Sequence, residues 1–361
     1  MTPVQPAVAF AVQGSTGDDL WGRWQRRAFT LPLLLVLWVV ANAAVLPALV
    51  LALAVDLLRP RRLVVTRTTV FFWFFVWAEV VGLGAALLLW IGTGLGRRRV
   101  AFVHGNERLQ VAWNRALLGV GLRVYGMRVL VEGQEALQQP GPLWVLARHV
   151  STVDTVLPIW LLSGVGRRSF RFVLKRELLG DPCLDVVGNR LPNHFVRRGA
   201  EDNTEEVAGA RALMRGLGEA SCVVVFPEGG RFTPARRARL LERLAQGGRA
   251  PVLALAQRLT RTLPPLTEGT LAMGEANPGA DLVVVAHRGL EGTTSFADFW
   301  AGRLVGVTLA VQVWRVPFDR IPRTREGLAA FLGERWLAVD TFVGGGGPAA
   351  PQPLDGGGSP G

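Results

Sequence analysis

The chain has 361 residues, of which 50% are hydrophobic and 19% are charged, and its mean hydropathy is +0.29. A soluble domain is rarely so apolar, so the composition excludes a disordered or collagen-like chain and indicates a part embedded in a membrane. The net charge of +12 suits a nucleic acid, an anionic membrane surface or a phosphorylated substrate, and charge alone does not choose among these partners.

Two long apolar segments lie in the N-terminal part of the chain. Residues 31–55 carry no charge and residues 68–96 carry only Glu79. Each segment exceeds the roughly 20 apolar residues that a helix needs to cross a bilayer. We therefore expect an N-terminal segment over residues 1–30, followed by a membrane-associated hairpin of two helices over residues 31–98.

Arginines flank this hairpin before, between and after its two helices. They are Arg23, Arg26, Arg27, Arg59, Arg61, Arg62, Arg67, Arg97, Arg98 and Arg99. If both helices spanned the bilayer, either the connecting loop or both outer flanks would violate the preference for positive charge on the cytoplasmic side. A monotopic hairpin that dips into one leaflet avoids this conflict, and both topologies stay open. A cleavable signal peptide is a weaker third interpretation, because apolar sequence continues past the small residues at 41–43.

From about residue 99 the sequence changes to short apolar runs separated by turn residues, which is typical of an α/β domain. Four apolar runs predict strands at residues 143–147, 170–174, 222–226 and 282–286. The last two are almost continuously apolar, which is typical of central strands covered on both faces. Helical spacing over 204–217 and 234–244 alternates with these strands. We therefore expect an α/β domain over residues 99–343, with a mostly parallel central sheet flanked by helices.

The C-terminal part adds a strand, a helix and a tail. Residues 307–316 alternate imperfectly and predict an edge strand, while residues 325–343 have helical periodicity. Residues 344–361 are rich in Gly and Pro and cannot bury a core, so a disordered tail is expected. Cys183 and Cys222 are the two cysteines, which excludes a disulfide framework and fits a reducing compartment.

His149 and Asp154 form an H-x4-D pair directly after the strand predicted at 143–147. Within one regular helix, side chains five residues apart point in different directions. They can meet if the histidine ends a strand and the aspartate lies in the first turn of a helix, and the N-cap residue types Ser151 and Thr152 favour such a helix start. The carboxylate would then fix the imidazole tautomer and leave the other nitrogen to take a proton from a hydroxyl. A capping Asp beside an unrelated His is the simpler alternative.

A second polar cluster, Phe-Pro-Glu-Gly-Gly-Arg at 226–231, also follows a buried strand. Its glycines, including Gly229, allow the positive φ of a tight turn. Glu228 and Arg231 should fall at the sheet edge where His149 is expected, and α/β sheets bind ligands at that edge. Arg231 offers a bidentate fork to a phosphate. A surface turn with a Glu–Arg pair is the alternative.

Taken together, three blocks of the sequence resemble the glycerophospholipid acyltransferase family. The blocks are His149-Val-Ser-Thr-Val-Asp154, Asn193-His-Phe195-Val-Arg-Arg198 and Phe226-Pro-Glu228-Gly229-Gly-Arg231. They occur in the order and approximate spacing of that family. The chain is similar to 1-acylglycerol-3-phosphate acyltransferases, particularly those of the lysocardiolipin-type branch, over about residues 110–340.

The resemblance implies a membrane-bound O-acyltransferase whose catalytic domain lies on the cytoplasmic side of the cell membrane. Such an enzyme moves a fatty acyl group from acyl-CoA or acyl carrier protein to the hydroxyl of 1-acyl-glycerol-3-phosphate and yields phosphatidate. It implies no cofactor and no catalytic metal, and no nucleic-acid partner is expected. By position, His149 would be the general base and Asp154 its orienting partner. The residues that the resemblance assigns to the substrate phosphate are Arg198, Glu228, Gly229, Arg231 and Lys175.

The sequence departs from the family pattern at the acceptor site. Gly230 stands where the family usually has threonine, and Leu266 falls where the resembling branch tends to have arginine. Another lysophospholipid or a lyso-aminolipid is therefore the alternative acceptor. A non-catalytic membrane scaffold that binds anionic lipid or nucleic acid is the alternative from a different class, and it would tolerate the loss of His149.

Overall fold

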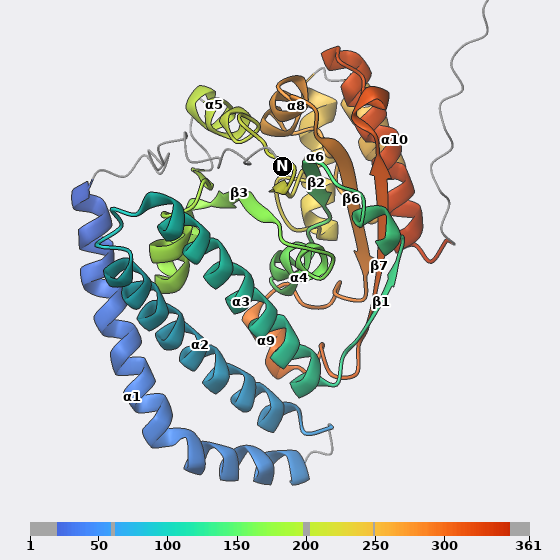
Figure 1. Ribbon diagram of the computed structural model, residues 1–361. Coiled ribbons are helices and arrows are strands. Elements are labelled where there is room, and N and C mark those ends of the chain that lie inside the picture. Colours follow the sequence, from blue (N-terminus) through green and yellow to red (C-terminus); the bar gives the residue numbers. More distant parts are fainter. Residues whose placement is uncertain (1–19, 59–61, 198–202, 248–249, 347–361) are drawn as a thin grey trace, which may run out of the picture.

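The computed structural model describes residues 20–346 except 59–61, 198–202 and 248–249. Arg198 and most of the expected tail at 344–361 lie outside the described residues. Within this part of the chain, three long helices lie against one side of an α/β domain (Figure 1).

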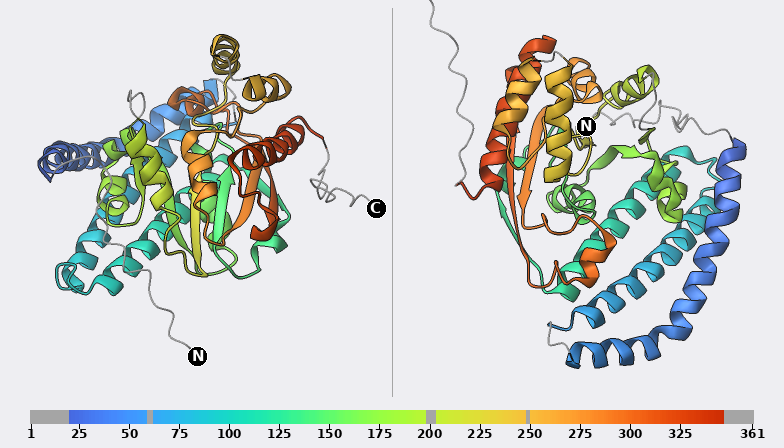
Figure 2. Two further views of the ribbon diagram at one scale, coloured as in Figure 1. Left: turned by 90° about the horizontal axis from the view of Figure 1, so that it is seen from above. Right: turned by 180° about the vertical axis from the view of Figure 1, so that it is seen from behind.

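The first two of these helices form a hairpin, and the first of them begins at Leu20 rather than at the expected residue 31. The long helices are α1 (Leu20–Leu58), α2 (Val64–Gly92) and α3 (Arg99–Tyr125). Among the described residues, α1 and α2 are long and apolar enough to cross a bilayer, and α1 buries almost none of its apolar surface inside the protein. Pro32 and Pro47 lie inside α1, which curves along its length, because proline removes a helical hydrogen bond. α3 lies between α2 and the sheet in both side views (Figures 1 and 2).

The described part of the domain contains one sheet with the strand order β1-β7-β6-β2-β5-β3-β4. The strands are β1 (Arg128–Glu132), β2 (Leu143–Ala147), β3 (Ser169–Lys175), β4 (His194–Val196), β5 (Ser221–Val225), β6 (Asp281–Arg288) and β7 (Thr308–Val316). Neighbouring strands are parallel except β6 and β7, which are antiparallel. This confirms the predicted mostly parallel α/β fold. The expectation of an edge strand at 307–316 was wrong, because β7 lies between β1 and β6.

Helices cover both faces of the sheet. The remaining helices are α4 (Leu157–Ser163), α5 (Thr204–Ala212), α6 (Pro234–Gln246), α7 (Ala250–Arg258), α8 (Glu268–Glu275), α9 (Phe296–Trp300) and α10 (Arg325–Val343). Single helical turns lie at Gln134–Leu137, Val153–Val156, Arg176–Gly180, Leu184–Gly188 and Phe318–Arg320. α3, α4 and α9 pack on one face, and α5, α8 and α10 pack on the other.

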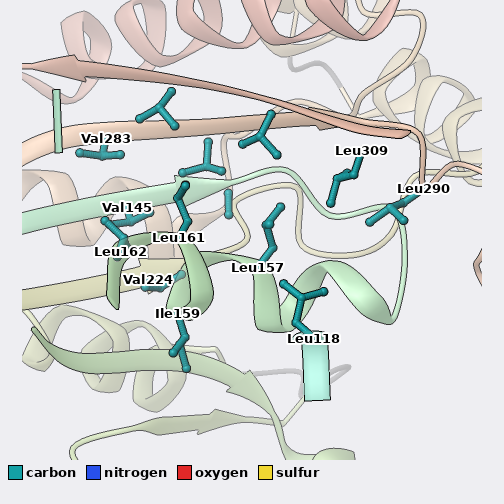
Figure 3. Packing of buried hydrophobic residues seen from close by; sticks show 14 of the residues in the cluster. Leu118, Val145, Leu157, Ile159, Leu161, Leu162, Val224, Val283, Leu290 and Leu309 are labelled. Atoms are coloured by element: carbon teal, nitrogen blue, oxygen red, sulfur yellow. The ribbon is translucent and has the colours of Figure 1, made fainter. Parts of the chain in front are cut away.

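Strand β2 shows why helices cover both faces of the sheet. Its five residues are all buried, and they alternate between the two cores. Val145 packs in the core beneath α3 and α4 (Figure 3), whereas Trp144 packs in the core beneath α8 and α10. A fully buried Val or Leu side chain contributes about 1.5–3 kcal/mol, so a strand apolar on both faces is stable only between two layers.

The hairpin is fastened to the domain at both ends. Near the start of α1, Arg26 and Arg27 donate to the carboxylate of the buried Asp185, at 2.6 and 2.8 Å. Near the start of α2, the Thr68 hydroxyl donates to the Phe299 carbonyl at 3.1 Å. The open end of the hairpin and its turn therefore contact the same domain.

Candidate active site

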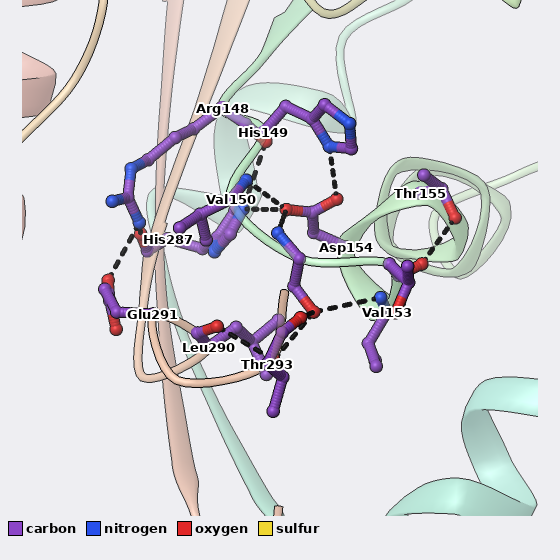
Figure 4. A network of polar contacts seen from close by, with 12 residues as sticks. Arg148, His149, Val150, Val153, Asp154, Thr155, His287, Leu290, Glu291 and Thr293 are labelled. Carbon is purple, nitrogen blue, oxygen red and sulfur yellow. Dashed lines mark hydrogen bonds and ion pairs between the residues drawn. The ribbon is translucent and has the colours of Figure 1, made fainter. Parts of the chain in front are cut away.

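The site forms where β2 ends and the chain turns into α4 (Figure 4). Nδ1 of His149 lies 2.8 Å from Oδ1 of Asp154. The second oxygen, Oδ2, accepts from the backbone N–H groups of Val150 at 2.6 Å and Ser151 at 2.7 Å. The carboxylate therefore holds the turn that precedes the helical segment Val153–Val156 and contacts the imidazole at the same time. Asp154 lies inside that segment, whose N-cap position is Thr152, so it is not the capping residue of the simpler alternative.

The lowered pKa of Asp154 determines which ring nitrogen of His149 carries the proton. Burial alone would raise the pKa of Asp154, but hydrogen bonds from His149 and His287 outweigh burial and hold the pKa well below its usual range. An ionised carboxylate only accepts, so Nδ1 of His149 carries the proton. Nε2 of His149 has no hydrogen-bond partner among the described residues. It is therefore the ring nitrogen able to accept a proton from a ligand.

Glu228 supports the histidine through the backbone. Its Oε1 accepts from the His149 N–H at 3.2 Å, and its Oε2 accepts from the Leu263 N–H at 2.9 Å. The Phe232 N–H donates to the His149 carbonyl at 3.1 Å, and the Phe226 ring lies 4.8 Å from the imidazole centroid. Burial raises the pKa of Glu228 to about 7. The Phe-Pro-Glu-Gly-Gly-Arg segment thus holds the backbone of His149 in place.

The glycines of that segment make room for an arginine that the sequence did not reveal. Gly229 has a φ of 64°, and its carbonyl accepts from Nη2 of Arg236 at 3.2 Å. A Cβ atom at Gly230 would overlap the Arg236 guanidinium. Arg231 donates through Nη1 to the Thr294 carbonyl. Two guanidinium groups therefore flank the turn, of which only Arg231 was expected.

The expected basic residues follow the C-terminal ends of neighbouring parallel strands. Lys175 is the last residue of β3 and is half-buried, and it pairs in register with Val196 of β4. Strand order places β2, β5, β3 and β4 side by side, so His149, Glu228 and Lys175 share one edge of the sheet.

His287 is a further residue at this site. It lies on β6, which is next to β2, and the sequence alone allowed it either to line this edge of the sheet or merely to end the strand. Its Nε2 lies 3.1 Å from the carbonyl of Arg148 and 3.5 Å from Oδ2 of Asp154. A histidine at the end of an apolar strand beside β2 was the signal, but only the strand order brings it to the carboxylate.

Two cavities adjoin the segment that carries His149. An apolar cavity of about 280 Å³ is lined by Thr152 and Val153 of the turn that follows His149 and by side chains of α2, α3 and α9. A polar cavity of about 780 Å³ is lined by Arg148 and Val150 of the same segment. Its other charged lining residues are Arg261, Arg288 and Glu291. The arrangement suits an amphipathic ligand with an apolar chain and an anionic group.

In the described part of the chain, no group of three or more His, Cys, Asp or Glu side chains is placed to hold a metal ion.

Comparison with known proteins shows which proteins the domain resembles. Residues 128–267 match the family model described as Acyltransferase. Among solved structures, the chain is similar to the 1-acyl-sn-glycerophosphate (LPA) acyltransferase PlsC from Thermotoga maritima, with a TM-score of 0.49 and 16% sequence identity. That match covers 77% of this chain and 95% of the other. No curated protein matches the chain. The matched segment contains both His149 and Glu228, and the match supports the acyltransferase family that the three sequence blocks predicted.

Proposed function

We propose that the protein transfers a fatty acyl group from an acyl thioester to the free hydroxyl of 1-acyl-glycerol-3-phosphate and so forms phosphatidate. The observation that carries this proposal is the contact between His149 and Asp154, which leaves Nε2 of the imidazole unpartnered by the described residues. The acyltransferase domain supplies the reaction class. The family resemblance supplies the acceptor.

The geometry supports a direct transfer without a covalent acyl-enzyme. Nε2 of His149 removes the proton of the acceptor hydroxyl while that oxygen attacks the thioester carbonyl carbon. Asp154 stabilises the imidazolium that forms. When the tetrahedral intermediate collapses, the carbon–sulfur bond breaks and the imidazolium returns the proton to the departing thiolate. The products are an ester and a free thiol, and both substrates are consumed in equal amounts.

The acyl chain and the phosphate of the substrates need different surroundings, one apolar and one positively charged. We assign the acyl chain to the apolar cavity beside Thr152 and Val153, because this cavity is lined mainly by aromatic and aliphatic side chains. We assign the phosphate to Lys175, Arg198 and Arg231, with the backbone at Gly229. The carboxylate of Glu228 is already occupied by two backbone N–H groups, so we give it a supporting role rather than a phosphate contact.

We further propose that the hairpin is monotopic and that the domain lies on the cytoplasmic face of the cell membrane. Two contacts support this topology: Arg26 and Arg27 bind Asp185 near one end of the hairpin, and Thr68 binds Phe299 near its turn. A helix pair that contacts one domain at both ends lies along it. Held in the bilayer surface, the site meets lipid substrates without extracting them into water, and nearby arginines attract anionic lipid by about 1 kcal/mol each.

The test is acyl transfer from a radiolabelled thioester to lysophosphatidate by the purified full-length protein and by His149→Ala. General-base catalysis contributes about 10²–10⁴-fold, so the variant should lose activity by that factor. His104→Ala is the matched control, because His104 is an exposed histidine on α3. Equal activity of wild type and His149→Ala would contradict the mechanism. Binding to anionic vesicles without turnover would indicate the non-catalytic scaffold instead.

The same assay identifies the acyl donor and the acyl acceptor. Acyl-CoA and acyl carrier protein are supplied separately, and lysophosphatidate is compared with other lysophospholipids and a lyso-aminolipid. The proposed acceptor requires that lysophosphatidate give the highest kcat/KM. A higher value for another acceptor would keep the reaction class and replace the substrate.

A further inference from the structure

The polar cavity of about 780 Å³ carries more positive charge than its own residues neutralise. Its charged lining residues are Arg148, Arg261, Arg288 and Glu291. Arg148 is fully buried and forms an ion pair with Glu291, with Nη1 2.8 Å from Oε1 (Figure 4). Glu291 is the acid among these four residues, and it is already paired. The guanidinium groups of Arg261 and Arg288 therefore give the cavity two positive charges that no carboxylate of its lining balances.

Both of these arginines keep N–H groups for a ligand. Arg288 is half-buried, its Nη1 donates to the Phe342 carbonyl at 3.2 Å, and its Cζ lies 5.0 Å from the centre of the Phe342 ring. Arg261 is exposed, and its backbone N–H donates to Oδ1 of Asp340 at 2.7 Å. A guanidinium group has five N–H donors in a planar fork that matches phosphate. The cavity therefore presents two such forks to an anion.

Helix α6 begins at the same cavity. Its N-cap residue Thr233 lines the cavity, and the Thr233 hydroxyl accepts from the Arg236 N–H at 3.1 Å. The first turn of a helix favours a negative charge, because its N–H groups and the helix dipole point towards it. Thr294 and Thr308 also line the cavity and add hydroxyl groups. Arginines, hydroxyl groups and a helix start together favour a phosphate group as the occupant.

The position of the cavity indicates which phosphate it holds. Arg148 and Val150 stand on either side of His149 in the sequence, and both line the cavity. Arg288 ends β6, whereas Lys175 ends β3, and these strands lie on opposite sides of β2. The polar cavity is therefore at the β6 side of the site, away from the β3 side to which we assign the phosphate of the acceptor.

The acyl donor supplies a second phosphate. Acyl-CoA and acyl carrier protein both hold the acyl group on the sulfur of phosphopantetheine. The whole pantetheine chain separates the phosphate of this arm from the sulfur, so this phosphate needs a site beside the imidazole rather than at it. A polar cavity that adjoins the His149 segment meets this requirement.

We propose that the polar cavity binds the phosphate of the phosphopantetheine arm of the acyl donor, through Arg261 and Arg288. This inference rests on the proposed function for its assumption that the donor is such a thioester. Both kinds of donor are then recognised through the group that they share. A thioester of pantetheine without the phosphate leaves both guanidinium groups without their anion, and it should bind more weakly.

The test measures equilibrium binding in the absence of an acceptor, so it does not depend on turnover. The full-length protein in detergent micelles is titrated by calorimetry with octanoyl-phosphopantetheine and with octanoyl-pantetheine. We expect the phosphorylated compound to bind about a hundredfold more tightly. Arg261→Gln and Arg288→Gln should each reduce this preference about tenfold. Arg258→Gln is the matched control, because Arg258 is an exposed arginine on α7 outside the lining.

Three results would overturn the inference. The first is equal binding of the two compounds to the wild type, and the second is an unchanged preference in both variants. The third is a loss of lysophosphatidate binding in the variants with the donor preference intact, which would give the cavity to the acceptor. If Arg288→Gln fails to fold, Arg261→Gln decides, because no described residue forms a hydrogen bond with the Arg261 side chain.

Two further arms identify the source of the phosphate and separate the inference from the proposed reaction. Octanoyl-CoA and octanoyl carrier protein should both bind Arg261→Gln about tenfold more weakly than the wild type. A loss confined to octanoyl-CoA would place its adenosine phosphates in the cavity and overturn the assignment to the shared arm. A preference for the phosphorylated compound in a protein without acyl transfer would support the inference and remove the proposed reaction.

Discussion

Nε2 of His287 lies 3.5 Å from Oδ2 of Asp154, so two imidazoles flank one buried carboxylate (Figure 4). The same Nε2 lies 3.1 Å from the carbonyl of Arg148. Both neighbours are acceptors, so this nitrogen carries a proton. Nδ1 of His287 is buried without a partner in the described structure, where a second proton would be unsatisfied. His287 therefore presents an N–H donor to the carboxylate.

Replacement of His287 by leucine should slow acyl transfer. Asp154 would lose one of the two imidazole donors that hold its pKa down. A less well oriented carboxylate should lower kcat by about tenfold. His287→Gln, which retains an N–H donor, should recover part of the lost kcat.

His104→Leu is the control for this substitution, because it removes an exposed histidine from α3. If His287→Gln lowered kcat as much as His287→Leu does, the N–H donor would have no role and His287 would act only in packing. Equal kcat values for wild type and His287→Leu would show that His287 has no role in the reaction.

Glu228→Gln should alter how stability depends on pH. Burial raises the pKa of Glu228 from an ordinary value of 4.5 to about 7. Between these values the folded protein retains a proton that the unfolded chain releases, so stability falls as pH rises through this window. The wild type should therefore lose stability between pH 4.5 and 7 relative to the glutamine variant. Asp154, whose pKa is lowered, changes stability only in more acidic solution.

The amide of Glu228→Gln also destabilises the folded protein directly. It turns an N–H group towards the backbone N–H of His149 or Leu263, which should destabilise the protein by about 1–3 kcal/mol at low pH. Thermal unfolding at a series of pH values measures both effects, with the exposed Glu219→Gln as control. A constant difference between wild type and Glu228→Gln across the window would show that the carboxyl does not titrate there.

Local sequence pattern was enough to predict the core of the fold and half of the site. The runs at β2, β5 and β6 are apolar on both faces, and their ends fall within two residues of the predicted ends. His149 and Asp154 were found because a strand end, N-cap residue types and a carboxylate follow one another. Each of these signals lies within about ten residues of sequence, where propensity and burial act together.

Other features depend on contacts between distant segments. β4 has three residues and β1 alternates exposed and half-buried positions, so neither stands out as a strand by itself. β7 becomes internal only because β1 pairs with it. His287 reaches Asp154 through the register of β6 on β2. The hydrophobic periodicity of the sequence does not reveal these contacts between distant segments.

The ion pairs of Asp185 should hold α1 against the domain. Its carboxylate is fully buried, while Arg26 and Arg27 keep about a fifth of their side-chain surface exposed, at 21% and 22%. Removal of one partner from a buried pair is strongly destabilising, and partial exposure reduces the effect here to about 2 kcal/mol. Asp185→Asn should therefore release the start of α1 and speed tryptic cleavage after these arginines in detergent.

Asp319→Asn is the matched control, because Asp319 is exposed and far from the hairpin in the sequence. Cleavage is followed by mass spectrometry of the released N-terminal peptides. Equal cleavage rates for wild type and Asp185→Asn would show that the pairs do not restrain the helix.

Labelling of the hairpin turn distinguishes the monotopic from the spanning topology. Arg62 lies exposed in the turn between α1 and α2, and both native cysteines, Cys183 and Cys222, are buried. In Arg62→Cys, a membrane-impermeant maleimide should label inside-out vesicles and leave right-side-out vesicles unlabelled, because the turn packs against the domain through Thr68. Glu219→Cys reports the side of the domain itself. If the two variants label from opposite sides, the hairpin spans the bilayer, and the contacts at Thr68 and Asp185 could not both exist in the membrane.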